Sequence, residues 1–179
     1  MISENVLRKY AKLAVVMGVN VQKGQPLVIS SDVRNHEFVS YCVEEGYKAG
    51  ASQVVVEWSS EHSTKWSYEY MSKEDLCEIP QWQFDKRKYA QDKGACFLNI
   101  ASSTPGLLKD IDAEKIHAAQ MAGSKKFMPL ASYTMANKGQ WCICALPSVG
   151  WAKKAFPDKS DDEAVKALWD AILMSVRVN

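Results

Sequence analysis

The chain has 179 residues, of which 47% are hydrophobic and 24% are charged, and this is the composition of an ordinary soluble globular protein. A chain of this length buries roughly 70% of the surface that its unfolded form exposes, so it needs neither disulfides nor a structural metal to fold. The 22 lysines and arginines nearly balance the 21 aspartates and glutamates, and the absence of a basic run argues against a surface for nucleic acid or anionic membranes.

The predicted elements alternate between helices and apolar strands. Ser3 is expected to cap a first helix that ends at Gly18, and five of its residues share one apolar face: Val6, Leu7, Tyr10, Ala14 and Met17. Strands are predicted at about 26–30, 53–58, 95–100 and 141–146. Further helices are predicted at about 34–49, 61–92 (with breaks at Ser72 and Pro80), 112–135, 149–155 and 160–176. Pro129 is expected to kink or interrupt the helix at 112–135.

This alternation predicts the fold class. Each strand is apolar throughout, and the run from Trp141 to Leu146 in particular is typical of a strand that is covered on both faces. We therefore expect one α/β domain over residues 1–179, built on a parallel sheet of about four strands flanked by helices on both faces. The sequence leaves the strand order open.

Ligands of open parallel sheets bind beyond the carboxyl ends of the strands, which here are residues 30–32, 57–60, 101–104 and 147–148. None of these loops has the glycines of a phosphate-binding loop, so the sequence argues against nucleotide binding. Serines beside helix starts are expected to be helix caps. Asp32 and Glu57 can either line a pocket for a cationic group or cap helices, and capping is the favoured interpretation.

Metal and redox motifs are incomplete. His36-Glu37 resembles the start of a zinc-protease helix, but Ser40 stands where the second histidine is needed, and neither His62 nor His117 has a partner at ligand spacing. Cys142 and Cys144 face the same side of a strand, where such a pair can be redox-active or bind a soft metal, but buried cysteines more often act as small hydrophobic residues. The sequence therefore predicts no metal site and no catalytic residue within this chain.

Several stretches of the chain carry a family resemblance: 10–13, 18–25, 50–51, 54–58, 107–109 with Asp112, 151–157 and 168–172. In these stretches the sequence resembles the thermophilic-type metalloaminopeptidases, the family that includes aminopeptidase T and aminopeptidase S. The resemblance covers essentially the whole chain and places it in the N-terminal half of that family.

The resemblance implies a cytoplasmic, commonly dimeric enzyme that removes N-terminal amino acids from peptides with a pair of divalent ions, zinc or cobalt. It also implies that the metal ligands belong to a C-terminal catalytic domain that is absent here, so this chain alone is expected to be inactive and to hold no metal. The domain is expected to frame the catalytic cleft, and its candidate cleft residues are Glu57, Ser59, Ser148 and Trp151.

The absence of a membrane-length apolar stretch and of a signal pattern, together with five scattered cysteines, independently predicts a reduced cytoplasmic protein.

Two other functions stay open. The chain can be a free-standing α/β module that binds a small molecule or a protein, in which case it should behave as a monomer in isolation. A nucleotide-dependent enzyme is a third hypothesis, and dinucleotide binding by the pure chain would support it. Six tryptophans favour a domain that meets another domain or subunit.

Overall fold

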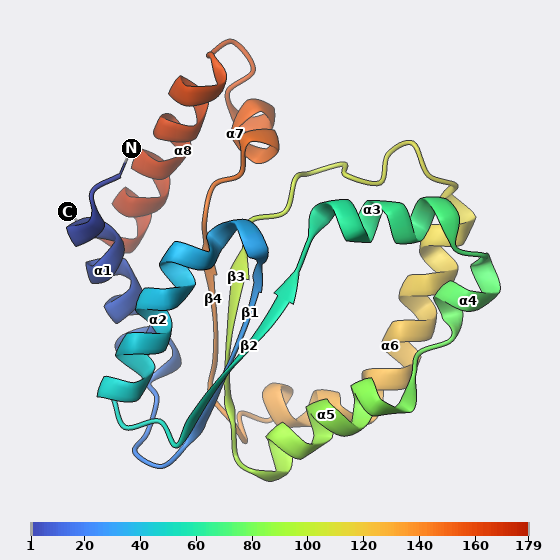
Figure 1. The fold of residues 1–179 in the computed structure, drawn as a ribbon, viewed down its shortest axis with the longest axis horizontal. Helices are drawn as coiled ribbons and strands as arrows, with labels where there is room; N and C mark the ends of the chain where they lie inside the picture. Colours follow the sequence, from blue (N-terminus) through green and yellow to red (C-terminus); the bar gives the residue numbers. More distant parts are fainter. Residues whose placement is uncertain (1, 179) are drawn as a thin grey trace.

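A four-stranded parallel sheet forms the centre of the molecule in the computed structural model, which describes residues 2–178. Its strands lie in the order β2-β1-β3-β4 (Figure 1). They are β1 (Pro26–Asp32), β2 (Gln53–Ser59), β3 (Cys96–Ala101) and β4 (Trp141–Ala145), and every neighbouring pair is parallel. The predicted α/β class and the predicted four-stranded parallel sheet are therefore confirmed.

One face of the sheet, which we call the closed face, carries the main hydrophobic core. It is covered by α1 (Glu4–Lys12), η1 (Leu13–Val19), α2 (His36–Lys48), α7 (Val149–Ala155) and α8 (Asp161–Val176). Leu27, Ile29 and Leu98 project into this core and are at most 1% exposed. Tyr10 ties α1 to the sheet, because its hydroxyl donates to the carbonyl oxygen of Ala145 at 3.1 Å.

The opposite face, the open face, is covered less completely. Its helices are α3 (Glu61–Tyr70), α4 (Lys73–Cys77), α5 (Gln81–Asp92) and α6 (Ala113–Met135), which form a ring beside the sheet (Figure 1). The core here is small: Val28, Ala95 and Phe97 are its buried members, and Val55, Ala90 and Tyr133 pack against them. Helices thus lie on both faces, as predicted, but they shield the two faces unequally.

The first helix differs from its prediction in its second half. From Leu13 to Val19 the backbone is a π-helix, in which hydrogen bonds skip one more residue than in an α-helix. The wider turn changes which residues share a face. Met17 is 72% exposed whereas Tyr10 and Ala14 are buried, so the prediction that Met17 shares their face is wrong. Gly18 lies inside this segment instead of ending it, and a Cβ there would come within 2.7 Å of the Cys142 sulfur, so η1 packs closely on β4.

Strand β4 lies at an edge and is covered on one face only. Cys144 and Leu146 are buried on the closed face, whereas Trp141 and Ile143 are 50% and 58% exposed. The prediction that this strand is covered on both faces is therefore wrong. Hydrophobicity alone could not distinguish a doubly covered strand from an edge strand that is apolar on its exposed face as well.

Pro129 lies within α6 without interrupting it, because the helix continues to Met135. The last turns of α6 run in a different direction from the first turns (Figure 1). A bend is expected there, since proline removes one helical N–H and its ring crowds the preceding turn. Of the two predicted effects of Pro129, the break is excluded.

Serine caps begin several helices, as predicted. Ser3, Ser60, Ser72, Ser148 and Ser160 each accept a hydrogen bond from a backbone N–H in the first turn, and Ser160 with Glu163 forms the predicted capping box. The breaks predicted at Ser72 and Pro80 separate α3, α4 and α5. None of the helices in the part of the chain described here is long and apolar enough to cross a membrane.

Candidate functional site

A row of polar side chains crosses the open face towards the carboxyl end of the sheet. Ser30 of β1 is in register with Glu57 of β2 on one side and with Asn99 of β3 on the other. Asn99 is in turn in register with Ile143 of β4. Because side chains alternate along a strand, these four residues share one face with the buried Val28 and Phe97. The open face is therefore apolar near its start and mostly polar towards its end.

Glu57 is held by a cation from the same chain. Its Oε1 lies 2.9 Å from Nζ of Lys86 on α5, and its Oε2 accepts from the Ser30 hydroxyl at 3.3 Å. The cap of the helix that follows β2 is Ser60 and not Glu57. The carboxylate is paired with Lys86 of the same chain, so a pocket for a cationic ligand at Glu57 stays a prediction. Sequence patterns could not identify Lys86, because it comes from a helix 29 positions further along the chain.

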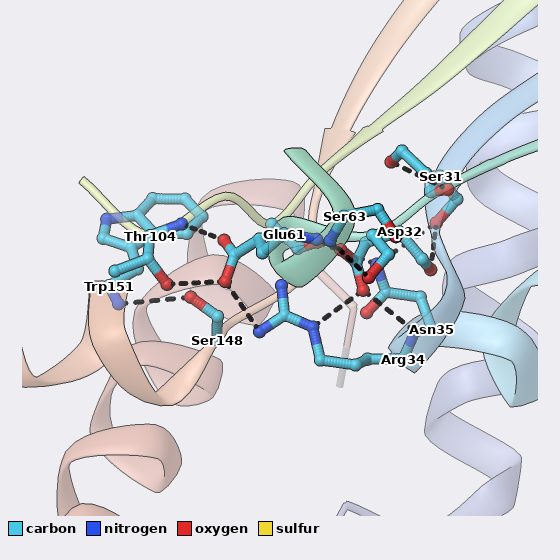
Figure 2. Close-up of polar contacts among 12 residues, drawn as sticks. Ser31, Asp32, Arg34, Asn35, Glu61, Ser63, Thr104, Ser148 and Trp151 are labelled. Carbon is cyan, nitrogen blue, oxygen red and sulfur yellow. Dashed lines mark hydrogen bonds and ion pairs between the residues drawn. The ribbon is translucent and has the colours of Figure 1, made fainter. Parts of the chain in front are cut away.

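Asp32 and Arg34 form the centre of an ion-paired cluster at the carboxyl ends of β1 and β2 (Figure 2). Asp32 Oδ1 accepts from the backbone N–H of Arg34 at 3.0 Å and from its guanidinium Nε at 2.7 Å. Asp32 Oδ2 accepts from the backbone N–H of Glu61 at 3.1 Å, at the start of α3. Asp32 is therefore a helix cap, the favoured one of its two predicted roles.

Glu61 extends the cluster to the segment that follows β3. Arg34 Nη1 lies 3.1 Å from Glu61 Oε2, which also accepts from the Thr104 hydroxyl at 3.0 Å, and the backbone N–H of Thr104 donates to Glu61 Oε1. Thr104 in turn packs against α7, because a Cβ on Gly150 would come within 2.9 Å of the Thr104 Cβ. This cluster joins the ends of β1, β2 and β3 to α7.

The charges within the cluster shift its acid–base properties. Burial by itself raises the pKa of Asp32, but the hydrogen bonds and the positive charge of Arg34 outweigh it and hold that pKa below its ordinary value. The hydrogen bond to Asp32 raises the pKa of Arg34 in turn. Both groups stay charged at neutral pH, so the cluster acts as a structural ion pair and not as an acid or base.

A second set of hydrogen bonds stabilises the same edge. The Asn35 amide donates to the hydroxyls of Ser31, at 3.1 Å, and Ser102, at 2.8 Å (Figure 2). Ser59, a candidate cleft residue, donates from its hydroxyl to the carbonyl oxygen of Ser31 at 3.3 Å. Ser59 is exposed at the end of β2, two residues beyond Glu57.

The other two candidate cleft residues, Ser148 and Trp151, lie at the start of α7. The buried Ser148 hydroxyl accepts from the backbone N–H of Trp151 at 3.1 Å and so caps the helix. The Trp151 side chain is partly buried and packs against the main core. Figure 2 shows both residues beside Thr104, at the end of the cluster opposite Asn35.

Replacing Ser148 with alanine is expected to lower the free energy of unfolding by about 1 kcal/mol, because the first turn of α7 loses its buried cap. Urea denaturation measures this. Ser103→Ala is the control: Ser103 is exposed, and no side-chain hydrogen bond of it is found within residues 2–178. The control should stay within about 0.5 kcal/mol of the parent protein. Equal losses in the two variants would contradict a capping role.

The polar row borders a large recess, the sheet hollow, between the open face and the ring of helices. It comprises three adjoining spaces of about 630, 500 and 440 Å³. Each pair of these spaces shares two bordering residues, so the three are neighbours. The shared residues are Ser30, Glu57, Trp58, Arg87, Asn99 and Thr134. Glu57 and Ser59 border the hollow, and both are among the residues selected from the sequence. Ser30 borders the hollow too and belongs to the predicted strand-end loop 30–32, although it was not among the four candidate cleft residues. Asn99 and Arg87 were not predicted; a polar residue inside the apolar run 95–100 was a usable signal for Asn99, whereas Arg87 lies on α5 and had none.

The cysteines offer no reactive pair on this edge. Cys42, Cys77, Cys96, Cys142 and Cys144 are all free thiols. Burial raises the pKa of Cys96 to about 11 and that of Cys144 to about 12, so both remain protonated at neutral pH and behave as small hydrophobic residues.

Within residues 2–178, no group of three or more His, Cys, Asp and Glu side chains is placed to hold a metal ion, so the residues present do not fit the metal pair that the resemblance implies.

Comparison with known proteins assigns a relationship to nearly the whole chain. The family described as thermophilic metalloprotease (M29) matches residues 3–179. Aminopeptidase AmpS of Bacillus subtilis (strain 168) is 39% identical over 173 residues, which are 97% of this chain and 42% of that protein. Aminopeptidase PepS of Streptococcus thermophilus is 35% identical over 96% of this chain and 42% of its own length.

A solved structure shares the fold. Wild-type AmpT from Thermus thermophilus superimposes with a TM-score of 0.87 at 29% sequence identity, over 94% of this chain and 43% of that chain. The chain therefore spans less than half the length of the relatives that it matches.

Proposed function

Because the chain belongs to the thermophilic metalloprotease (M29) family, we propose that it forms the N-terminal domain of a metal-dependent aminopeptidase, which removes N-terminal amino acids from peptides. The observation that carries this proposal is similarity along the full chain to proteins that are named aminopeptidases. The likeness in fold to AmpT supports it independently of any single motif.

In this proposal the catalytic residues and two divalent ions, zinc or cobalt, belong to a C-terminal catalytic domain. Bound metal ions of this kind lower the pKa of a water molecule and polarise the peptide carbonyl. The residues of this chain would contribute the wall of the cleft. The remaining parts of the proposal are a homodimer and a cytoplasmic location, as the resemblance implies.

The sheet hollow is the part of this chain that we assign to the cleft. The part of the hollow that borders the ends of β1, β2 and β3 lies at the carboxyl end of a parallel sheet, where ligands of open α/β sheets bind. Glu57 and Ser59 border it and are proposed as cleft residues. We assign Ser148 and Trp151 a supporting role at the rim, since the Ser148 hydroxyl and the Trp151 N–H are bonded to each other.

A chimeric enzyme tests the proposal. The matching N-terminal 42% of Bacillus subtilis AmpS is replaced by this chain, and zinc- or cobalt-dependent hydrolysis of leucine p-nitroanilide is measured. We expect the chimera to be active within about tenfold of AmpS, because a conserved fold preserves the positions of the catalytic groups. We expect the 179-residue chain alone to be inactive at every metal concentration. A folded, metal-loaded chimera without activity, or an active 179-residue chain, would contradict the proposal.

The size of the endogenous protein provides a second test that needs no substrate. An antibody raised against this chain is used to blot native extract, and a band well above 20.0 kDa is the expected result. A single band at 20.0 kDa would instead support the alternative, a free-standing α/β module that binds a small molecule or a protein.

A further inference from the structure

Arg87 of α5 lies where two spaces of the sheet hollow meet. It borders both the space of about 630 Å³ and the space of about 500 Å³. Its side chain is half-buried, and its guanidinium carbon lies 3.9 Å from the centre of the Phe97 ring. This contact holds the guanidinium against the sheet, and no hydrogen bond from it to another group is found within residues 2–178.

The charge of Arg87 is not paired within residues 2–178, where no carboxylate lies within ion-pairing distance of its guanidinium. Glu57 is the acidic residue that interacts with it electrostatically. Both Glu57 oxygens already have partners, Lys86 at 2.9 Å and the Ser30 hydroxyl at 3.3 Å. Burial lowers the pKa of Arg87, and the negative charge of Glu57 only partly opposes this shift. The Arg87 guanidinium is therefore partly removed from water and has no anionic partner within residues 2–178.

The residues around Arg87 indicate what kind of ligand would pair with its charge. The charged residues that border these two spaces are Glu57, Lys86 and Arg87, which together carry a net charge of +1. A monoanion would neutralise them, whereas a phosphate dianion would leave an excess of negative charge. Aromatic side chains form much of the remaining wall: Trp58, Trp82, Phe127, Phe97 and Trp141. Such walls favour an apolar or aromatic group next to the anion.

We propose that Arg87 binds the carboxylate of a ligand whose adjacent side chain is apolar or aromatic, as at the C-terminus of a short peptide. A guanidinium recognises a carboxylate through two parallel N–H···O bonds, and partial burial strengthens them. The simpler interpretation is that Arg87 only packs on Phe97. The two interpretations differ in whether a carboxylate binds, and the proposal does not depend on aminopeptidase activity.

The test is a titration of the ¹⁵N-labelled 179-residue chain with N-acetyl-L-phenylalanine, followed by NMR. We expect the acid to shift the Arg87 Nε–H resonance and the indole N–H resonances of Trp58, Trp82 and Trp141. N-acetyl-L-phenylalaninamide, which lacks the carboxylate, should bind about tenfold more weakly. Acetyl-Ala-Ala-Phe is the second acid: tighter binding than N-acetyl-L-phenylalanine supports a peptide C-terminus, and equal binding supports a free aromatic acid of the same class.

Two variants test whether Arg87 is responsible for the preference for the acid over the amide. Arg87→Met keeps an unbranched apolar stem over Phe97 and should bind acid and amide equally. Lys88→Met is the matched control, because Lys88 is exposed and paired with Asp92 at 2.5 Å, away from the hollow, and it should retain the tenfold preference. Equal binding of acid and amide by the parent chain, or no binding at about 10 mM, would overturn the proposal without the use of any variant. An unchanged preference in folded Arg87→Met would overturn it as well.

Discussion

Replacing Asp32 with alanine is expected to lower the free energy of unfolding by about 3 kcal/mol. The carboxylate is buried and accepts hydrogen bonds from two backbone N–H groups, those of Arg34 and Glu61, besides its ion pair with the Arg34 guanidinium. Its loss removes the cap of the short 3₁₀ helix Val33–Asn35 and the acceptor of the Glu61 N–H at the start of α3, which Ser60 still caps. It also leaves the Arg34 charge with one partner fewer. For a chain of this length, thermal unfolding should shift downwards by about 6–12 °C.

The control for this variant is Asp162→Ala. Asp162 also lies in the first turn of a helix, but it is exposed and no side-chain hydrogen bond or ion pair of it is found within residues 2–178. Its replacement should change the free energy of unfolding by no more than about 0.5 kcal/mol. If both variants unfold at the same temperature, the Asp32 cluster contributes nothing specific to stability.

The Asp32 carboxylate also makes the stability of the protein depend on pH. The pKa of Asp32 is lower in the folded protein than in the unfolded chain, so its stabilising effect is fully present above the unfolded value, about 3.9. The effect is lost as the pH falls from there through the folded pKa. Asp32→Asn should therefore be less stable than the parent protein at pH 7, and the difference should shrink below about pH 4. A difference that stays constant down to pH 2.5 would show that Asp32 does not titrate as proposed.

Replacing Gly139 with alanine is the second change with a large expected effect. Gly139 is buried in the turn before β4, and an added Cβ would overlap the ring of Tyr133, with the hydroxyl oxygen 2.5 Å away. The ring cannot move without loss, because its hydroxyl donates to the carbonyl oxygen of Ala95 at 2.9 Å and the ring packs at 90° to that of Phe97. We expect a loss of about 2–4 kcal/mol in urea denaturation.

Gly123→Ala is a comparison variant that is expected to raise the free energy of unfolding instead of lowering it. Gly123 lies within α6, and a Cβ there would meet no other atom within 4 Å. Alanine is the better helix former, so this variant should gain up to about 1 kcal/mol. A loss in both variants, or in neither, would contradict the close packing of Gly139 on Tyr133.

The parts of the fold that depend on local sequence were predictable. Alternation of apolar runs with capped helices gave the number of strands, their parallel arrangement and the starts of α4 and α8, because capping and hydrophobic periodicity act over a few residues. The π-helix over Leu13–Val19 was not predictable in this way, since it is stabilised by packing on β4.

The candidate site was predictable only in part. Glu57 and Ser59 were found because they lie at the carboxyl end of an apolar strand, and Asp32 because it precedes a helix. Their partners could not be found, because Lys86, Glu61 and Thr104 come from distant segments that only the tertiary fold brings together. The exposed face of β4 was missed for a related reason, since coverage depends on which helix packs above a strand.

The unequal cover of the two sheet faces has a consequence for local motion. Within the described residues, α3, α4 and α5 contain no buried residue and α6 contains only Ala119, whereas the closed face carries the main core. Local opening of the helical ring is therefore expected to require less free energy than unfolding of the sheet, and its amide hydrogens are expected to exchange with solvent before those of β1 and β3. In the proposed cleft the sheet would then form a rigid wall and the helices an adjustable one, so ligands of different size would be accommodated by movement of the helices alone.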